Sequence, residues 1–179
     1  MHPNRFKKLF NIITNLLHIL LWKVLYPKAC RINFFQPLLA HLSIEVGKGK
    51  IIIGKRLYNR KPLHILVDND GICKIGENCF FNHNCSITCL NKISIGDRCT
   101  FGNNLVLVDH DHAKDGGDFI TGTVSIGNDT WVGANVVILR DTHIGRNCII
   151  AAGSIVKGNV PDNTLYIQKR SSECKKIIQ

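Results

Sequence analysis

A six-residue period in residues 126–160 constrains the fold of this chain more than any other feature. An aliphatic residue opens each of six consecutive blocks, at Ile126, Val132, Ile138, Ile144, Ile150 and Val156. The fifth place of each block holds a small or β-branched residue, at Thr130, Val136, Thr142, Cys148, Ser154 and Val160. At average composition, such a run arises by chance in about one frame in ten thousand. Neither a helix nor an ordinary strand repeats every six residues, so the pattern predicts a repeating β-coil.

The composition agrees with one regular β-domain. The chain has 179 residues, enough for a single domain with a substantial core. Aromatic residues make up only 7% and methionine occurs once. A core with few rings and many branched aliphatic residues suits a regular β-stack better than a helical bundle.

The eight cysteines fit the repeat rather than a metal site or a disulfide framework. Four of them, Cys79, Cys85, Cys99 and Cys148, occupy fifth places of six-residue blocks, where a small apolar side chain is expected. Cysteine serves there as a small hydrophobic residue. Spacings of six residues also differ from those of zinc knuckles, so we expect buried thiols and no bound metal. Free thiols favour a reducing cytoplasm.

The net charge of +10 is spread along the chain, with an excess at both ends. The basic residues do not form a cluster interleaved with aromatic residues, and the chain contains no nucleic-acid reader motif. We therefore expect no nucleic-acid partner. A phosphorylated small ligand and an anionic membrane surface both remain compatible with the charge.

Residues 1–40 are predicted to form a separate N-terminal helical segment. Apolar residues recur at helical spacing between Leu9 and Leu25, and Pro27 is expected to end the helix. Polar residues interrupt the apolar run, which makes it a poor membrane span. A secretory signal peptide is the rival, but no convincing cleavage site follows. The helix therefore either packs against the β-stack, which we favour, or lies on a membrane surface.

The β-domain is expected over residues 41–163, with a basic tail at 164–179. Clean blocks open at Ile75, Phe81 and Ile87, and after two extra residues at Ile95, Phe101 and Leu107. Three blocks make one triangular coil. Residues 55–70 lack the period and are predicted to be irregular.

A polar loop over residues 109–125 breaks the repeat and carries His110 and His112. Long loops in a tight repeat are more often functional than not. An imidazole has an unperturbed pKa of about 6.5, which allows it to take a proton from a hydroxyl near neutral pH. The two histidines are therefore the best catalytic candidates, and the alternative is a solvated surface pair.

Three stretches, 75–84, 95–112 and 126–161, together resemble the hexapeptide-repeat acyltransferases. The similarity is greatest to their sugar O-acetyltransferase branch, which includes galactoside and maltose acetyltransferases and capsule or lipopolysaccharide acetyltransferases. The resemblance implies an all-β fold, a left-handed parallel β-helix of hexapeptide repeats with an N-terminal amphipathic helix and a protruding loop. It also implies a homotrimer, with active sites between neighbouring subunits.

The resemblance assigns roles to the polar residues. His112 matches the family's catalytic histidine, and His110 is the alternative because the Asp-His-Asp-His run can be aligned two ways. Asn82 and Asp109 match acceptor-binding positions. Asn82 has an equally good structural interpretation, since asparagine is common in tight turns.

The residues implied to bind acetyl-CoA are Trp131, Gly133, Ala134, Ala152, Lys157 and Arg170. The backbone N–H of Ala134 would stabilise the negative charge of the tetrahedral intermediate. Gly133 would let the thioester approach the backbone, and Lys157 and Arg170 would contact phosphate groups. The segment after the last coil departs from the family pattern, so Arg170 rests on position alone.

The function expected from the sequence is acetyl transfer from acetyl-CoA to a sugar hydroxyl in capsule or lipopolysaccharide biosynthesis. The protein would be cytoplasmic, with possible peripheral contact at the inner membrane face, and would need no metal. One rival is a zinc-dependent lyase of the β-helical carbonic anhydrase type, which would use histidines such as His83, His110 and His112. The other rival is a non-catalytic β-helix scaffold.

Overall fold

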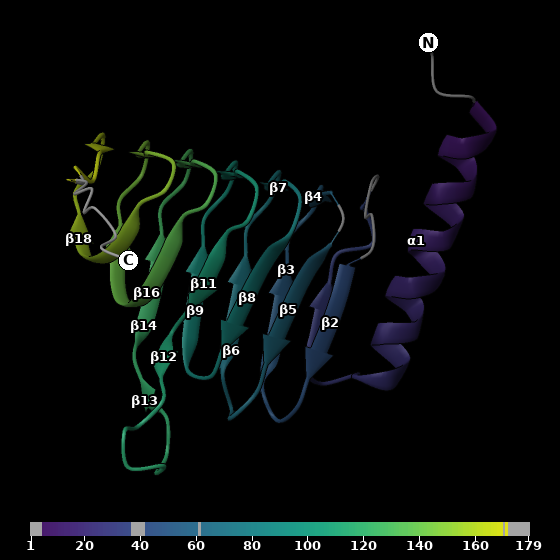
Figure 1. Cartoon of the computed structure of the whole chain (residues 1–179). Coiled ribbons are helices and arrows are strands. Elements are labelled where there is room, and N and C mark those ends of the chain that lie inside the picture. The colour runs from purple at the N-terminus through teal and green to yellow at the C-terminus, as the bar shows by residue number, and fades with distance from the viewer. Residues whose placement is uncertain (1–4, 37–41, 61, 170, 172–179) are drawn as a thin grey trace, which may run out of the picture.

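The computed structural model describes residues 5–36, 42–60, 62–169 and 171 of the chain. The helix α1 spans Arg5–Leu25, and short strands follow it along the rest of the described chain (Figure 1). Pro27 lies two residues beyond the end of α1, where its fixed φ and missing N–H prevent the helix from continuing. No helix in these residues is long and apolar enough to cross a bilayer.

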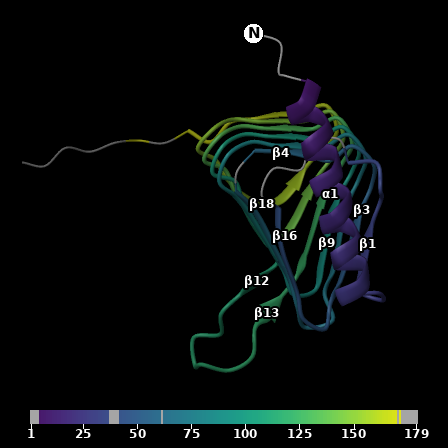
Figure 2. The same ribbon diagram turned by 90° about the vertical axis from the view of Figure 1, so that its right-hand side faces the viewer.

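The strands stack in parallel as the three faces of a prism, whose triangular outline is visible along its axis (Figure 2). The first face contains β2 (Leu42–Val46), β5 (Leu63–Val67), β8 (Cys85–Cys89) and β11 (Val106–Val108). The second face contains β1 (Cys30–Ile32), β3 (Lys50–Ile53), β6 (Ile72–Ile75), β9 (Lys92–Ile95) and β14 (Thr123–Ile126). The third face contains β4 (Tyr58–Asn59), β7 (Phe80–Phe81), β10 (Thr100–Phe101), β15 (Trp131–Val132), β17 (Ile149–Ile150) and β19 (Leu165–Tyr166).

Two longer strands, β16 (Val137–Ile144) and β18 (Ile155–Val160), bend around a corner of the prism. Each contributes its first residues to the first face and its last residues to the second face. These two strands join both faces into one 11-stranded hydrogen-bonded sheet. The protein is thus a parallel β-helix, as the sequence predicted.

The register confirms the period of three blocks per coil. Val137 pairs with Ile155, so this coil takes 18 residues. Ser86 pairs with Val106 at a spacing of 20, which contains the two extra residues predicted before Ile95.

The interior of the prism is formed by the aliphatic residues that open each block. All six of those predicted in residues 126–160 are at most 3% exposed. The fifth places are buried too, and their polar groups bond to the backbone, as when Thr130 Oγ1 donates to the carbonyl of Gly145 at 3.0 Å. The fourth place turns the corner with a positive φ, at Asp129, Asn135, Asp141, Asn147 and Gly153. Asparagine, aspartate and glycine adopt this conformation most readily, which explains their recurrence.

The seven cysteines in the described residues lie inside this core, as expected. Cys79, Cys85, Cys99 and Cys148 are buried at corners of the prism. The Cys148 thiol lies 3.0 Å from the carbonyl of Pro161 in the next coil. These side chains therefore act as small packing residues in the described chain.

The β-helix begins earlier than expected, and residues 55–70 are more regular than predicted. Strand β1 pairs with β3 within the segment that the sequence assigned to helix. Strands β4 and β5 lie in the region predicted to be irregular. The period is hidden there because Asn59, a polar residue, occupies an interior place in register with Phe81.

The helix α1 packs across the N-terminal end of the prism (Figure 1). Ile19 is fully buried, and Trp22 and Tyr26 pack against the core. This arrangement agrees with the packing alternative favoured from the sequence. One face of α1 covers the first coil, while its opposite face remains exposed.

Candidate functional site

A β-hairpin leaves the prism at the corner between the first and second faces, which we term the hairpin corner. Strand β12 (His110–Asp111) pairs in antiparallel fashion with β13 (Ile120–Thr121), and residues 112–119 connect them (Figure 1). Val106 pairs with Val137, so this coil takes 31 residues where the next takes 18. The sequence predicted a protruding loop over residues 109–125; the hairpin starts within this range, and the chain re-enters the prism with β14 at Thr123.

The neck of the hairpin is fixed by hydrogen bonds to the adjoining coil. The Gly122 N–H donates to the Asp109 carbonyl at 2.6 Å, and the Asn91 side-chain amide donates to the Gly122 carbonyl at 2.8 Å. A Cβ on Gly122 would lie within 2.1 Å of an oxygen of Asp141. A side chain at this position would therefore displace the Asp141 carboxylate where the chain re-enters the prism.

Asp109, which was predicted to bind the acceptor, lies inside the corner of the coil. Its side chain is fully buried and accepts the backbone N–H groups of Leu90 and Asn91, each at 2.8 Å. One carboxylate oxygen also lies 3.3 Å from Nδ1 of His110. Asp109 thus connects the corner of the coil to the first histidine of the hairpin.

The two catalytic candidates meet around one aromatic ring. Phe119 contacts His110 edge-on with ring centroids 5.3 Å apart, and its centroid lies 4.8 Å from that of His112. The two imidazole centroids are 6.2 Å apart. The His110 side chain is 11% exposed, whereas His112 is exposed to solvent. The hairpin therefore presents one accessible imidazole and one partly enclosed imidazole that a carboxylate contacts.

Arg140, which the sequence analysis missed, fastens the hairpin to the prism. Its Nε donates to Asp111 Oδ2 at 2.5 Å, and the same guanidinium bonds to Asp141. The hydrogen bond from Arg140 holds the pKa of Asp111 below its usual range, with further attraction from Lys157 and His110. The same bond raises the pKa of Arg140. Because Asp111 lies between the two histidines in the sequence, this ion pair sets the position of both.

A second group of predicted residues lies at the corner between the third and first faces, which we term the glycine corner. The predicted residues Asn82, Gly133, Ala134 and Ala152 follow the ends of β7, β15 and β17. They stack in successive coils, with Gly102 after β10 between Asn82 and Gly133. A Cβ on Gly133 would lie 2.6 Å from the nitrogen of Ala152. The close stacking of the coils therefore requires glycine at this position, whether or not a ligand also approaches the backbone there.

The remaining predicted residues of this group differ in accessibility. Trp131, on the outer side of β15, is 55% exposed. The Asn82 side chain accepts the backbone N–H of His83 at 3.0 Å, a turn interaction, and stays partly accessible. The Ala134 N–H donates to no acceptor within the described residues.

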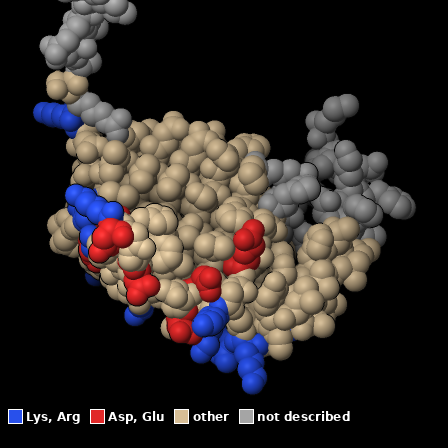
Figure 3. Space-filling view, turned by 60° about the horizontal axis from the view of Figure 1, so that its bottom comes forward, with Lys and Arg blue, Asp and Glu red and all other residues tan. Residues whose placement is uncertain are grey.

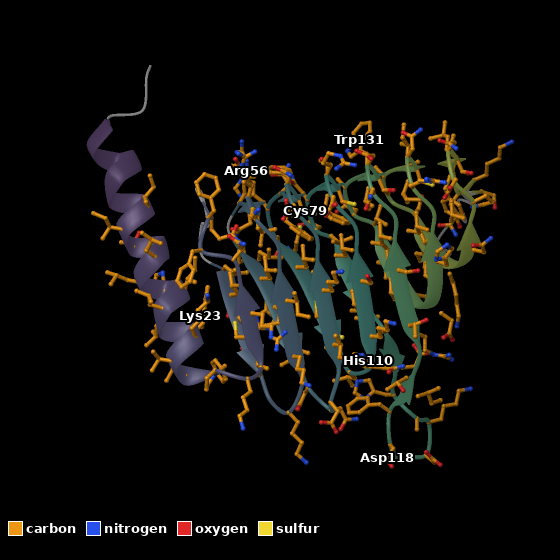
Figure 4. The ribbon with its side chains drawn as sticks, turned by 180° about the vertical axis from the view of Figure 1, so that it is seen from behind. Lys23, Arg56, Cys79, His110, Asp118 and Trp131 are labelled. Atoms are coloured by element: carbon orange, nitrogen blue, oxygen red, sulfur yellow. The ribbon has the colours of Figure 1, made fainter. Side chains whose placement is uncertain are left out.

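The predicted site residues do not converge in one chain. Trp131 and His110 lie at opposite edges of the prism (Figure 4). Lys157, predicted to share a site with Trp131, instead lies at the hairpin corner, where it attracts Asp111. Arg170 lies outside the described residues. His83 is at the glycine corner, away from the other two histidines of the zinc alternative, and the described residues contain no group of three or more potential metal ligands.

The face from which the hairpin emerges carries charges of both signs, with acidic and basic side chains interspersed (Figure 3). The pairs Arg140–Asp111 and Arg140–Asp141 account for part of this mixture. The positive net charge is therefore not concentrated at the hairpin.

The fold and the hairpin define a parallel β-helix of hexapeptide repeats interrupted by one histidine-bearing excursion. The model of the bacterial transferase hexapeptide (six repeats) matches residues 123–158, and that of the hexapeptide repeat of succinyl-transferase matches residues 73–108. Two stretches of this chain are therefore similar to models of hexapeptide-repeat transferases.

Two Escherichia coli K12 proteins illustrate the similarity. The galactoside O-acetyltransferase is 35% identical over 119 residues, which cover 63% of this chain and 57% of the relative. A provisionally named lipopolysaccharide biosynthesis O-acetyl transferase is 25% identical over 161 residues, covering 82% of this chain and 79% of the relative. The chain spans only about half the length of several of the relatives it matches.

One solved structure supports the fold. The crystal structure of a hexapeptide-repeat containing acetyltransferase from Vibrio cholerae superposes with a TM-score of 0.53 and 22% identity. The match covers 89% of this chain and 92% of that protein. The two proteins therefore share the same β-helical architecture over nearly their whole lengths.

Proposed function

We propose that this protein transfers an acetyl group from acetyl-CoA to a hydroxyl group of a sugar. The observation that carries the proposal is the pair of imidazoles on a hairpin anchored to a hexapeptide β-helix. The names of the relatives, galactoside O-acetyltransferase and lipopolysaccharide O-acetyl transferase, support the same reaction.

The exposed His112 is proposed as the general base, with His110 as the alternative. The imidazole takes the proton of the sugar hydroxyl while the oxygen attacks the carbonyl carbon of the thioester. The tetrahedral intermediate then collapses, the carbon–sulfur bond breaks, and the coenzyme A thiolate leaves. The imidazolium returns its proton to that sulfur, which restores the base. This direct transfer needs no covalent intermediate on the protein.

The glycine corner is proposed to hold the thioester. The N–H of Ala134, which has no acceptor in the described chain, is available to bind the oxygen that becomes negative in the intermediate. The exposed Trp131 offers an apolar surface beside it, and Asn82 and Ala152 lie in neighbouring coils of the same corner. Lys157 and Arg170 are proposed to contact phosphate groups of coenzyme A.

This division of the site supports assembly of the chain as a homotrimer. The base at the hairpin corner and the proposed thioester position lie at opposite edges of one prism (Figure 4). Neither corner alone brings one of the hairpin histidines and the Ala134 N–H together. We propose that each site combines the hairpin corner of one subunit with the glycine corner of its neighbour. Sedimentation at equilibrium should therefore give three times the mass of the chain.

The acceptor is proposed to be a sugar of a surface polysaccharide or of its lipid-linked precursor. The similarity to the lipopolysaccharide relative extends over 79% of that protein and supports this choice. Acetyl-CoA is a cytoplasmic thioester, so we place the reaction in the cytoplasm, with the protein in peripheral contact with the inner face of the membrane.

The proposal is tested by thiol release from acetyl-CoA across a panel of sugars and sugar nucleotides. We expect release that depends on at least one acceptor and yields an O-acetylated product by mass spectrometry. If no acceptor stimulates release and coenzyme A does not bind, the protein is a β-helix scaffold. Acceptor-independent hydration of carbon dioxide with bound zinc would instead favour the lyase.

A further inference from the structure

The outer side of α1 carries an apolar stripe that no described part of the chain covers. Ile13, Leu16, Leu17, Leu20 and Val24 recur at the spacing of one helical face. Their exposed fractions range from 38% to 74%. Side chains of α1 point away from the prism along this side (Figure 4). We term these five residues the outer stripe.

The outer stripe is not needed to hold α1 on the prism. The contact with the first coil uses Ile19, Trp22 and Tyr26, which lie on the opposite face of the helix. A helix that is apolar on both faces is expected to be covered on both faces. The outer stripe therefore requires another surface to cover it.

Two exposed aromatic residues, Phe34 and Phe35, lie in the segment that follows β1. Phe34 and Phe35 are 49% and 57% exposed. Lys23 Nζ lies 3.4 Å from the centre of the Phe34 ring, and the Arg56 guanidinium lies 5.4 Å from that of Phe35. Phe34 lines a pocket between α1 and the prism with Lys23 and Ile53, so it is not part of the outer stripe.

The charge of the N-terminal segment identifies the kind of surface. The first acidic residue of the chain is Glu45, which lies beyond this segment. Six basic residues precede it: Arg5, Lys7, Lys8, Lys23, Lys28 and Arg31. Such a segment attracts a surface rich in anionic phospholipids. A second copy of the same segment would bring like charges together, which disfavours self-association through the stripe.

We propose that the outer stripe of α1 docks the protein onto a membrane surface containing anionic phospholipids. The helix lies in the plane of the interface, with its outer stripe among the acyl chains and Lys23, Lys28 and Arg31 near the headgroups. This docking goes beyond the proposed acetyl transfer and does not depend on it, although it would bring the site close to a lipid-linked acceptor.

The test compares flotation of the full chain with vesicles of phosphatidylcholine alone and vesicles in which phosphatidylglycerol replaces part of it. We expect binding to the anionic vesicles, weaker binding to the neutral ones, and release by salt. The double variant Leu17→Glu, Val24→Glu should lower the affinity about tenfold or more, because both side chains would carry charge into the apolar layer.

A matched control is Ile72→Glu, which places the same charge at an exposed aliphatic residue on the second face, away from α1. This variant should bind vesicles like the wild type. Equal binding by the wild type and the double variant, or binding by neither, would overturn the proposal. A second outcome is that the wild type does not bind vesicles and the double variant sediments with a different mass. That result would show that a second copy of the chain covers the outer stripe. Vesicle binding does not require catalysis, so failure here leaves the acetyl-transfer proposal intact.

Discussion

The buried carboxylate of Asp109 lies 3.3 Å from Nδ1 of His110 while it accepts the backbone N–H groups of Leu90 and Asn91. Asp109 thereby connects the corner of one coil to the first residue of the hairpin. A carboxylate beside one ring nitrogen orients the imidazole and leaves the other nitrogen for proton exchange. Asp109 is therefore a positioning residue for the hairpin.

The variant Asp109→Asn should destabilise the fold and disturb the hairpin. Each carboxylate oxygen accepts one of the two N–H groups, so the NH2 of the amide would face the second donor and leave it without an acceptor. Leaving a buried polar group unsatisfied costs about 1–3 kcal/mol, which denaturant unfolding would measure. The control is Asp115→Asn at the exposed tip of the hairpin, where the side chain bonds only to the Gly117 N–H. Equal stability of the two variants would refute the structural role of Asp109.

The ion pair between Arg140 and Asp111 should matter for activity more than for stability. Surface pairs contribute about 0–1 kcal/mol, so Arg140→Gln should hardly change the unfolding free energy. It should lower kcat, because Asp111 and the adjacent histidines lose their fixed position. The control is Arg146→Gln, which removes a similar pair with Asp162 away from the hairpin. If both variants keep full activity, Arg140 does not position the site.

The same pair predicts how the hairpin responds to acid. Arg140 lowers the pKa of Asp111 in the folded protein. The pair therefore stabilises the hairpin above the unfolded aspartate pKa of about 3.9, and this contribution is lost as the pH falls through the folded value. NMR titration of the Asp111 carboxyl group should show a midpoint below that of a free aspartate, and Arg140→Gln should return it towards the free value. An unchanged midpoint in the variant would contradict the assignment.

The glycine corner makes a separate prediction about packing. In Gly133→Ala the new methyl group would meet the Ala152 nitrogen, and in a tightly stacked coil such overpacking costs about 1–3 kcal/mol. Gly117→Ala, whose nearest neighbour is a flexible aspartate side chain at 3.1 Å, should be tolerated. Thermal unfolding distinguishes the two variants. A Gly133→Ala protein as stable as Gly117→Ala would show that the coils can separate to admit a side chain.

The sequence predicted the β-helix correctly where the six-residue period continues through consecutive blocks. The blocks opened by Ile126 to Val156 place their aliphatic residues in the core because each position repeats its environment every six residues. The same reasoning failed before residue 70, where Asn59 takes an interior place and hides the register. Short strands such as β1 carry too few residues for a period to be recognised.

The candidate site was predicted less completely, because its contacts span the chain. The histidines of the hairpin stand out in sequence, but Arg140 reaches Asp111 across 29 residues and gives no local signal. The burial of Asp109 depends on the corner formed by Leu90 and Asn91, which sequence alone does not bring near it. The separation of Trp131 from His110 likewise becomes visible only once the coils are stacked (Figure 4).

The most direct test of the account compares acetyl transfer by the wild type, His112→Ala, His110→Ala and the control His143→Ala. His143 is an exposed histidine that bonds to Ser125 on the second face, away from the hairpin. Loss of the general base should lower kcat by about 10²–10⁴, with unchanged unfolding, and His143→Ala should remain fully active. We expect the full loss in His112→Ala. The same loss confined to His110→Ala would move the base to that residue. Transfer at wild-type rates in both hairpin variants would contradict the central claim that the hairpin supplies the base.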